Sequence, residues 1–323
     1  MFYKKVDKIK EPLSAIGYGC WGISGGDFWS GTTDESSIKT IQTAIKNGVN
    51  FFDVAPVYGF GHAEEILGKS IKGNRSKIFI ASKCGLVWDD DRNISNNLSP
   101  DSLEREINAS LKRLDVDYID LYQCHWPDPQ TDIKNTMKKL NELKDEGLIK
   151  YIGLTNFSIE EAKMAMYFGE ISSMQGLYNM LERNPDSYHN IPLEYKTEKE
   201  VFPFVKKNGI AFFPYSPLFQ GLLTDSFGES HNFDKNDVRN ANPKLNSPLF
   251  DKYYDKSLKI REIAKELGKP TSQLAINWLV QKDEITSIIA GAQNTEQLLQ
   301  NIEALTWNIP EETNEKLEKV LEE

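Results

Sequence analysis

The chain has 323 residues, and 38 Lys and Arg stand against 48 Asp and Glu, which gives a formal net charge of −10. Nucleic acid and anionic membranes attract basic surfaces, so this charge disfavours both as partners. Three cysteines without a CxxC pair argue against a disulfide framework and a zinc ribbon, and they fit a reducing compartment. The N-terminal residues lack the features of a signal peptide, and the apolar stretches fall well short of the ~20 residues that span a bilayer. We therefore expect a cytoplasmic protein that binds no metal.

Short apolar runs rich in β-branched and aromatic residues alternate with amphipathic helical patterns along the chain. Eight runs are expected as strands: 14–21, 49–55, 78–83, 118–125, 151–155, 173–178, 210–214 and 287–291. This alternation predicts a parallel sheet with crossover helices, and eight strands close a (β/α)8 barrel. A doubly wound open sheet is less favoured because no GxGxxG follows the first strand. The sequence thus predicts an α/β fold, with one (β/α)8 barrel domain over residues 1–323.

Capping residues and glycines mark the ends of the predicted helices. Leu103, Ile107, Leu111 and Leu114 recur at helical spacing and predict one apolar face. Helix starts are expected at Ser99-Pro100 and where a capping residue precedes a Glu or Gln by three positions, at Ser158, Thr197 and Asn294. Glycines that follow periodic stretches are expected in the left-handed C-terminal conformation: Gly48, Gly147, Gly169, Gly209 and Gly268.

The stretch Gly221–Lys256 interrupts the alternation. It is long, polar and rich in Asn, Asp and Pro. A connection of this length in a compact domain is usually functional, so we expect a long loop after the seventh strand, for instance a lid over a ligand.

Polar side chains terminate most of the predicted strands. In a parallel barrel the active site lies where the strands end, so these residues are expected to converge. They are Asp53, Lys83, His125, Thr155, Asn156, Gln175 and Tyr215, together with Tyr58, five residues after Asp53. Taken singly, they could have ordinary structural roles, as a helix cap, a snorkelling lysine, a half-buried aromatic or a structural histidine. Their joint occurrence favours a set of proton-handling groups at one site.

Several segments resemble the aldo-keto reductase family. The stretch GVNFFDVAPVYGFGHAEEILGKSI is similar to its signature, in which an Asp and a Tyr five residues later open the catalytic set. The lysine of IFIASK, the histidine of IDLYQCHWPD and the segments GLTNFS, QGLYN, PYSPL and IIAGAQNTEQLLQN match it in order and spacing. The resemblance runs from about Ile9 to Ala304 and is nearest to bacterial general-stress and inositol-operon reductases. It implies a barrel enzyme that reduces aldehydes or ketones with a nicotinamide cofactor.

The resemblance implies that four residues are catalytic: Asp53, Tyr58, Lys83 and His125. Carbonyl reduction leaves negative charge on the oxygen, so the site needs a proton donor and positive potential. Tyr58 is the expected general acid, and a Lys83 ammonium within hydrogen-bonding distance is expected to lower its pKa toward neutrality. Asp53 would pair with Lys83, and His125 would orient the carbonyl and share in the proton relay.

The implied cofactor is NADP(H), and NAD(H) is considered beside it. Thr155, Asn156 and Gln175 match the positions that bind the carboxamide, and Tyr215 matches the residue that stacks on the nicotinamide ring. The other expected cofactor contacts are Gly19, Cys20, Trp21, Asp53, the pyrophosphate segment Ser216, Leu218, Gln220 and Leu222, and the adenosine-end residues Gly291, Gln293, Gln297 and Asn301.

The adenosine end departs from the pattern of family members that prefer NADP. A 2′-phosphate is usually bound by Lys or Arg, but no basic residue lies between Lys282 and Lys316. We therefore expect use of both cofactors with a modest NADPH bias. Residual preference could come from the helix start near Thr295, or from Arg239 and Lys235 in the long loop.

Aromatic residues near the predicted strand ends are expected to wall the substrate pocket: Trp21, Phe28, Trp29, Trp88 and Trp126. Some of them could instead only close the barrel rim. Such a wall suits a small carbonyl substrate, an aldehyde, a ketone or a ring-bearing compound, rather than a polymer.

Three alternatives stand beside the reductase. The family fold also serves as an auxiliary subunit of potassium channels, which would make this chain a redox-sensing partner that binds the cofactor. The enzyme could also oxidise a polyol in the reverse direction. Lys83 could form a Schiff base as in an aldolase, although Tyr58, Asp53 and the nicotinamide-site segments favour the reductase.

Overall fold

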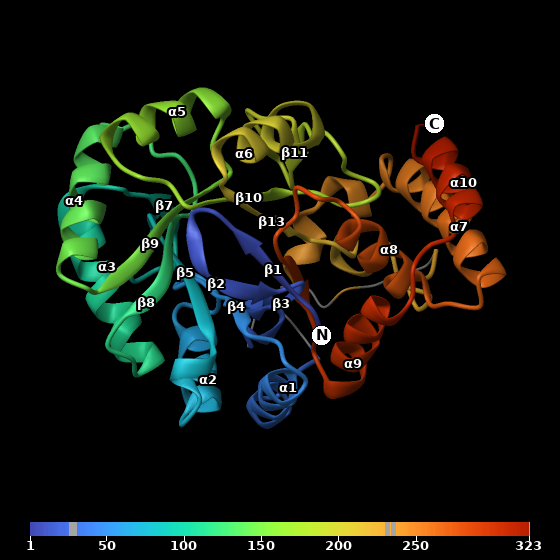
Figure 1. Ribbon diagram of the computed structural model, residues 1–323, viewed down its shortest axis with the longest axis horizontal. Coiled ribbons are helices and arrows are strands. Elements are labelled where there is room, and N and C mark those ends of the chain that lie inside the picture. Colours follow the sequence, from blue (N-terminus) through green and yellow to red (C-terminus); the bar gives the residue numbers. More distant parts are fainter. Residues whose placement is uncertain (26–30, 230–232, 234–236, 323) are drawn as a thin grey trace.

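The computed structural model describes residues 1–25, 31–229, 233 and 237–322. All eight predicted barrel strands are present: β3 (Ile16–Gly19), β4 (Phe51–Asp53), β5 (Phe79–Cys84), β8 (Ile119–Cys124), β9 (Ile149–Thr155), β10 (Ser173–Leu177), β13 (Ala211–Tyr215) and β14 (Ile288–Gly291). They form one sheet whose neighbours follow the chain order, with β14 beside β3. Between β13 and β14, Thr286 donates its backbone N–H to Phe212 O at 2.9 Å. The sheet closes into the predicted (β/α)8 barrel (Figure 1).

Helices cover the outside of the barrel (Figure 1). They are α1 (Asp34–Lys46), α2 (His62–Ile71), α3 (Pro100–Leu114), α4 (Ile133–Asp145), α5 (Ile159–Phe168), α6 (Phe202–Asn208), α7 (Phe250–Glu266), α8 (Thr271–Val280), α9 (Thr295–Glu303) and α10 (Glu311–Glu322). Two further strands, β1 (Tyr3–Val6) and β2 (Ile9–Ser14), form an antiparallel hairpin. Within the described ranges, no helix is both long enough and apolar enough to cross a membrane.

The interior of the barrel changes from apolar to charged along the strands. Phe51 and Phe213 stack inside it with ring centroids 4.5 Å apart, and Ile9 and Leu13 pack into the same cluster. Side chains alternate along a strand, so the residue two positions after Phe51 also faces the interior. That residue is the buried Asp53. An apolar floor therefore lies beneath a polar mouth.

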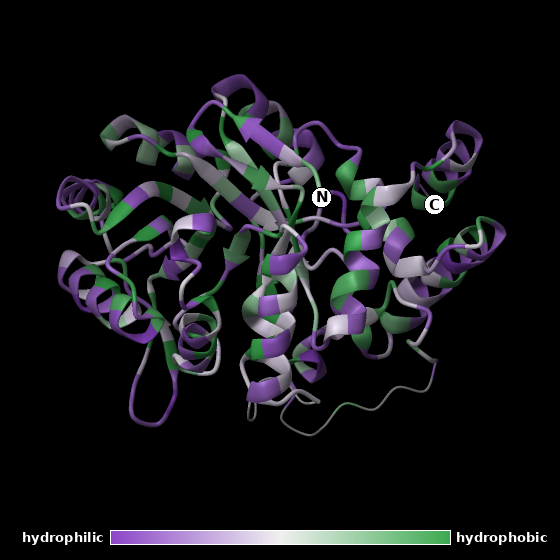
Figure 2. Cartoon of the chain, turned by 60° about the horizontal axis from the view of Figure 1, so that its bottom comes forward, coloured by the Kyte–Doolittle hydropathy of each residue, from purple (hydrophilic) through white to green (hydrophobic). Residues whose placement is uncertain are grey.

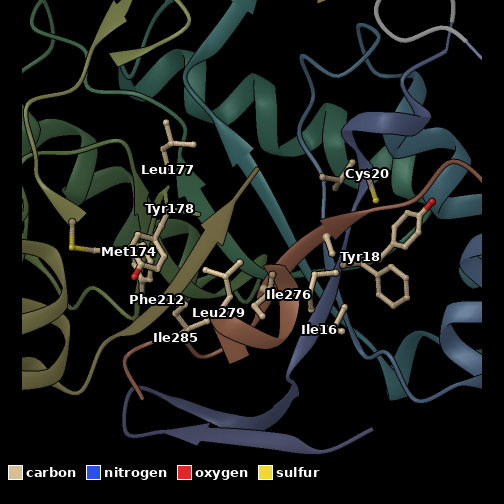
Figure 3. Packing of buried hydrophobic residues seen from close by; sticks show 14 of the residues in the cluster. Ile16, Tyr18, Cys20, Met174, Leu177, Tyr178, Phe212, Ile276, Leu279 and Ile285 are labelled. Atoms are coloured by element: carbon tan, nitrogen blue, oxygen red, sulfur yellow. The ribbon is translucent and has the colours of Figure 1, made fainter. Parts of the chain in front are cut away.

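A second apolar layer lies between the barrel and the helices, and part of it is drawn in Figure 3. It includes Ile16 and Tyr18 of β3 and Ile276 of α8, all of them buried. Hydrophilic and hydrophobic residues alternate along the helices, as Figure 2 shows. One buried face per helix produces such a pattern. In α3 the predicted apolar face is confirmed, since Leu103 and Ile107 are buried.

The structure confirms most of the predicted helix ends and corrects two. Ser158 forms the predicted capping box with Glu161, and Asn294 caps α9. Thr197 is not a cap, because its hydroxyl donates to Leu177 O at 2.8 Å within a buried segment. Gly169 is also wrong as a left-handed position, since its φ of 179° is extended backbone. The remaining predicted helix-ending glycines have positive φ: Gly48, Gly147, Gly209 and Gly268.

The long connection after β13 is present, but its predicted end is wrong. Helix α7 begins at Phe250, inside the predicted loop that ends at Lys256. Two short 3₁₀ turns, Val238–Ala241 and Pro243–Leu245, precede it. The polar composition that predicted a loop here also suits a solvated helix start.

Ser158→Ala should lower the free energy of unfolding by about 1 kcal/mol, because the Ser158 hydroxyl accepts from Glu161 N at 3.2 Å. Urea unfolding followed by circular dichroism measures the change. Ser99→Ala is the matched control, since Ser99 is the N-cap of α3 but makes no side-chain capping bond. Equal losses in the two variants would contradict the importance of the capping box.

Candidate active site

A buried ion pair joins the ends of two neighbouring strands. Lys83 of β5 lies with its Nζ 2.8 Å from Asp53 Oδ2 of β4. Lys83 Nζ also donates to Val54 O at 3.2 Å and to Tyr58 Oη at 3.2 Å. The side chains of Lys83 and Asp53 are 0% and 4% exposed. All three hydrogens of the ammonium therefore have acceptors within the protein, which favours a fixed ammonium over a Schiff-base lysine.

The other oxygen of Asp53 binds amides from across the barrel. Gln175 of β10 donates to Asp53 Oδ1 at 2.8 Å, and Gln123 of β8 approaches the same oxygen at 3.5 Å. Such hydrogen bonds offset the cost of burying a charged pair. Gln123 was not among the predicted site residues. Strand alternation could have indicated it, because Gln123 faces inward two positions before His125.

Tyr58 completes this cluster with its phenol. Burial raises the pKa of Tyr58 well above its usual value, and the Asp53 carboxylate raises it further. The expectation that Lys83 lowers this pKa is therefore wrong in this structure. The reason is that burial has the largest effect on this pKa, and the Asp53 carboxylate, which lies 2.8 Å from Lys83, raises it as well. Tyr58 keeps its proton at neutral pH, which is the form a general acid needs.

His125 follows β8 and lies beside Tyr58. The two ring centroids are 5.9 Å apart, with the planes at 77°. Burial lowers the pKa of His125 well below its usual value, and the Lys83 ammonium acts in the same direction. His125 is therefore a neutral imidazole at pH 7. The structure thus brings together all four residues predicted to be catalytic.

The end of β9 provides polar groups of the kind an amide ligand requires. Asn156 adopts a left-handed backbone conformation with φ 64°, and its Oδ1 accepts from Tyr215 Oη at 2.9 Å and Tyr195 Oη at 3.2 Å. The adjacent Thr155 hydroxyl is buried and has no hydrogen-bond partner within the described residues. An unpaired buried hydroxyl next to an Asn and Gln175 fits a carboxamide. Tyr195 was not predicted, because it lies in an irregular connection with no periodic signal.

The predicted pyrophosphate segment is a strained turn after β13. Ser216, Phe219 and Gln220 all have positive φ, of 54°, 49° and 55°. Asn179 holds this turn by donating to Ser216 O at 2.9 Å. Leu222 is buried in the core, and Leu218 packs against it. Left-handed conformations of residues other than glycine cost energy and cluster at ligand-binding sites.

Side-chain and backbone hydrogen bonds order the predicted adenosine end. Gln297 accepts from Gln293 N at 2.9 Å, and Asn301 donates to Gly291 O at 3.2 Å. Ser36 of α1 donates to Gln293 O at 3.3 Å, so α1 and α9 begin close together. Their first turns carry the acidic residues Asp34, Glu35 and Glu296.

At the end of β3, the first barrel strand, mainly backbone atoms face the mouth of the barrel. Gly19 pairs with Gly291 of β14, and the Cys20 side chain is fully buried. Arg239, which was considered for the adenosine end, binds Asp237 through two hydrogen bonds of 2.8 and 2.7 Å. Lys235 lies outside the described residues.

Two of the predicted aromatic wall residues contact groups near Tyr58. Trp21 stacks on Tyr58, with centroids 5.9 Å apart and an interplanar angle of 12°. Trp88 packs at 5.4 Å on Phe60, two residues after Tyr58. Trp126 is half-buried against the core. Phe28 and Trp29 lie outside the described residues.

Two aromatic residues that sequence reasoning missed also belong to this wall. Tyr188 and His189 lie within 6.1 and 6.4 Å of the Trp21 ring. Tyr188 also meets Tyr215 edge-on at 5.2 Å. They come from a hairpin with two-residue strands, which is too short to produce a periodic pattern.

The comparisons with known proteins agree with this geometry. The model of the Aldo/keto reductase family matches residues 15–322. Aldo-keto reductase YhdN of Bacillus subtilis is 36% identical over 100% of this chain and 94% of its own, and the NADH-specific methylglyoxal reductase of Escherichia coli is 34% identical over 92% and 91%. The structure of the glycerol dehydrogenase AKR11B4 from Gluconobacter oxydans has a TM-score of 0.86 and 30% identity, covering 99% of this chain and 94% of that one.

The chain belongs to the aldo/keto reductase family. It is an oxidoreductase that reduces carbonyl groups with a nicotinamide cofactor. The alternative of a redox-sensing auxiliary subunit is not favoured by these matches.

Lys83→Met should lower the free energy of unfolding by about 3–5 kcal/mol, because it leaves the Asp53 carboxylate buried without its cation. The double variant Lys83→Met with Asp53→Leu should recover part of this loss. Lys163→Met is a matched control, since Lys163 pairs with Glu160 at 3.3 Å on the exposed surface and should contribute at most about 1 kcal/mol. Denaturant unfolding measures the free energy of unfolding of all three variants. A double variant less stable than Lys83→Met alone would contradict the pairing of Lys83 with Asp53.

Proposed function

We propose that this enzyme reduces small aldehydes and ketones to alcohols with Tyr58 as the general acid. The observation that carries the proposal is the contact of Lys83 Nζ with both Asp53 and Tyr58, at 2.8 and 3.2 Å. This contact directs a buried ammonium at the oxygen of a protonated phenol. Charge that develops on the phenol after proton transfer would then be stabilised at once.

The polar residues around the mouth would hold the nicotinamide cofactor. Thr155, Asn156 and Gln175 would bind the carboxamide, and Tyr215 would pack on the ring. A reduced nicotinamide, when bound, supplies the hydride for the carbonyl carbon. The strained turn that begins at Ser216 would approach the pyrophosphate, with Leu218, Gln220 and Leu222 as its other members. Backbone of Gly19, Cys20 and Gly291 would lie beneath the cofactor, next to Trp21.

The residues around the carbonyl oxygen divide the proton chemistry. Tyr58 would donate its proton to the oxygen as negative charge develops there. Lys83 stays hydrogen-bonded to the phenol oxygen, and Asp53 keeps the ammonium in place. His125, neutral at pH 7, would donate a hydrogen bond that orients the carbonyl.

The protonation state of Tyr58 favours reduction over oxidation at neutral pH. Alcohol oxidation needs the phenolate as a base, and the raised pKa of Tyr58 keeps that form scarce. A glycerol dehydrogenase is among the similar structures, so polyol oxidation stays the second candidate. Oxidation would then require alkaline conditions, whereas reduction would proceed at pH 7.

The substrate is proposed to be small because aromatic side chains crowd the mouth. The Trp21 ring lies 5.9 Å from Tyr58, and Tyr188 and His189 lie 6.1 and 6.4 Å from the same Trp21 ring. The relative named methylglyoxal reductase is consistent with a short carbonyl compound. These side chains leave little width for a polymer.

Both cofactors are proposed to be used, with a modest preference of at most about tenfold for NADPH, which corresponds to ~1.4 kcal/mol. The acidic first turns of α1 and α9, with Asp34 and Glu296, weigh against a 2′-phosphate. Arg239, a basic residue considered for binding the 2′-phosphate, forms an ion pair with Asp237. The relative named NADH-specific methylglyoxal reductase is a similar chain whose name indicates a cofactor without that phosphate.

Tyr58→Phe should lower kcat for carbonyl reduction by ~10²–10⁴-fold, because only the proton donor is removed. The dissociation constant of the cofactor should change little, since the aromatic ring stays in place. Absorbance of the reduced nicotinamide follows the rate. Tyr167→Phe is the matched control, because Tyr167 is 82% exposed. Turnover near that of the unmodified enzyme would exclude Tyr58 as the general acid.

Gln297→Arg should shift the ratio of dissociation constants toward NADPH by about tenfold or more, since a charge-assisted hydrogen bond contributes ~1.5–3 kcal/mol. Gln297→Met is the control, because it also loses the bond to Gln293 N but adds no charge. Fluorescence titration with both cofactors measures the ratio. An enzyme that already prefers NADPH by more than ~1,000-fold would show that a basic group elsewhere completes the site.

A further inference from the structure

The tip of a short hairpin lies against the aromatic wall of the mouth. The hairpin is formed by β11 (Ser187–Tyr188) and β12 (Ile191–Pro192), and His189 is the first residue of its two-residue loop. The His189 ring lies 6.4 Å from Trp21 at 27°, and the same Trp21 ring stacks on Tyr58. A ligand held beside Trp21 would therefore lie near both Tyr58 and His189.

Hydrogen bonds determine which nitrogen of His189 carries the proton. Gln220 Nε2 lies 2.9 Å from His189 Nε2, and Gln220 Oε1 accepts from Asn242 Nδ2 at 2.9 Å. The amide nitrogen of Gln220 can only donate, so His189 Nε2 accepts and the ring proton lies on Nδ1. Among the described residues, no acceptor binds this Nδ1–H. His189 therefore keeps an uncommitted donor at the mouth.

The imidazole of His189 stays neutral. Burial lowers the pKa of His189 to about 4, and the nearby Lys244 ammonium acts in the same direction. Lys244 itself is balanced by Glu182 at 2.9 Å. A neutral donor can bind an uncharged oxygen without leaving an unpaired charge at the site.

Tyr188 provides a second donor next to it. The Tyr188 hydroxyl is shielded from solvent and has no hydrogen-bond partner in the described part of the chain. Ser216 and Gln220 lie close enough to influence its pKa, but neither is placed to complete a hydrogen bond. Ser216 and Gln220 line, with Tyr188 and His189, a small pocket with a cavity volume of about 10 Å³. Donors without acceptors around one pocket indicate a ligand rich in oxygen acceptors.

The backbone of His189 supports a role for its side chain. Its φ is 51°, and of the two loop residues only His189 has a positive φ. Such a two-residue loop favours glycine at its first position, because glycine takes positive φ without strain. The chain carries a strained histidine there instead, as strained residues at ligand sites often do.

We propose that His189 is a specificity-determining residue that donates a hydrogen bond from Nδ1 to a hydroxyl of the substrate. The enzyme then selects polyhydroxylated aldehydes over unsubstituted aldehydes of the same length. This inference rests on the proposed function, because it assumes that the carbonyl is reduced beside Tyr58. Tyr188 acts beside His189 as a second donor to the same ligand.

His189→Phe tests the proposal, because phenylalanine keeps a ring against Trp21 and removes the donor. The ratio of kcat/KM for erythrose to kcat/KM for butanal should fall by about three- to tenfold, as expected for one neutral hydrogen bond. Asn190→Ala, at the next position of the loop, is the matched control and should leave the ratio unchanged. The cofactor dissociation constant, measured by fluorescence, should stay within about twofold in both variants.

Three results would overturn the proposal: an unchanged ratio, an equal loss for both aldehydes, or a weakened cofactor as the main effect. If His189→Phe does not fold, His189→Gly serves instead, since glycine takes the positive φ without strain and should also lower the ratio. Failure of the unmodified enzyme to reduce either aldehyde would count against the proposed function itself. Reduction of both with an unaltered ratio would count only against the role of His189.

Discussion

The buried contact between Lys83 and Asp53 is the interaction on which the rest of the site depends. An ammonium with no solvent exposure is stable only if every hydrogen finds an acceptor, and Asp53, Val54 and Tyr58 supply them. The same contact positions the Tyr58 hydroxyl and draws the Gln175 amide to the other carboxylate oxygen. The ends of β4, β5 and β10 are thereby joined around one pair of charges. Burial, together with the Asp53 carboxylate, raises the pKa of Tyr58, and burial together with the Lys83 ammonium lowers the pKa of His125.

The barrel supplies the conditions that this pair needs. Period-two alternation places Phe51 in the apolar floor and Asp53 above it on the same strand. Residues other than glycine with positive φ lie in connections outside the barrel strands. Near the site they are Phe60, Asn156, His189 and the turn from Ser216 to Gln220, and elsewhere they are Arg92 and Asp115. The sheet thus positions the groups proposed for the proton chemistry, while several of the strained connections carry groups proposed to contact the cofactor and the substrate.

The parts that could be predicted from the sequence are those with strong local patterns. Apolar runs ending in Asp53, Lys83 and His125 predicted both the strands and their convergence, because parallel strands end at one mouth. Tyr195 and His189 could not be predicted, since they lie in irregular segments and become neighbours of the site only through tertiary packing. The pKa of Tyr58 was expected in the wrong direction, because the sequence shows neither how deeply the phenol is buried nor that Asp53 lies 2.8 Å from Lys83.

The central claim is that the mouth of the barrel passes hydride directly to a carbonyl carbon while Tyr58 protonates the oxygen. The most direct measurement uses a reduced nicotinamide cofactor that carries deuterium in the transferred position on C4, with an aldehyde substrate in ordinary water. We expect the alcohol product, examined by NMR, to contain one deuterium on the former carbonyl carbon. We also expect a primary isotope effect on the rate of single-turnover reduction. Alcohol formed without that deuterium, or deuterium released to solvent, would contradict the claim.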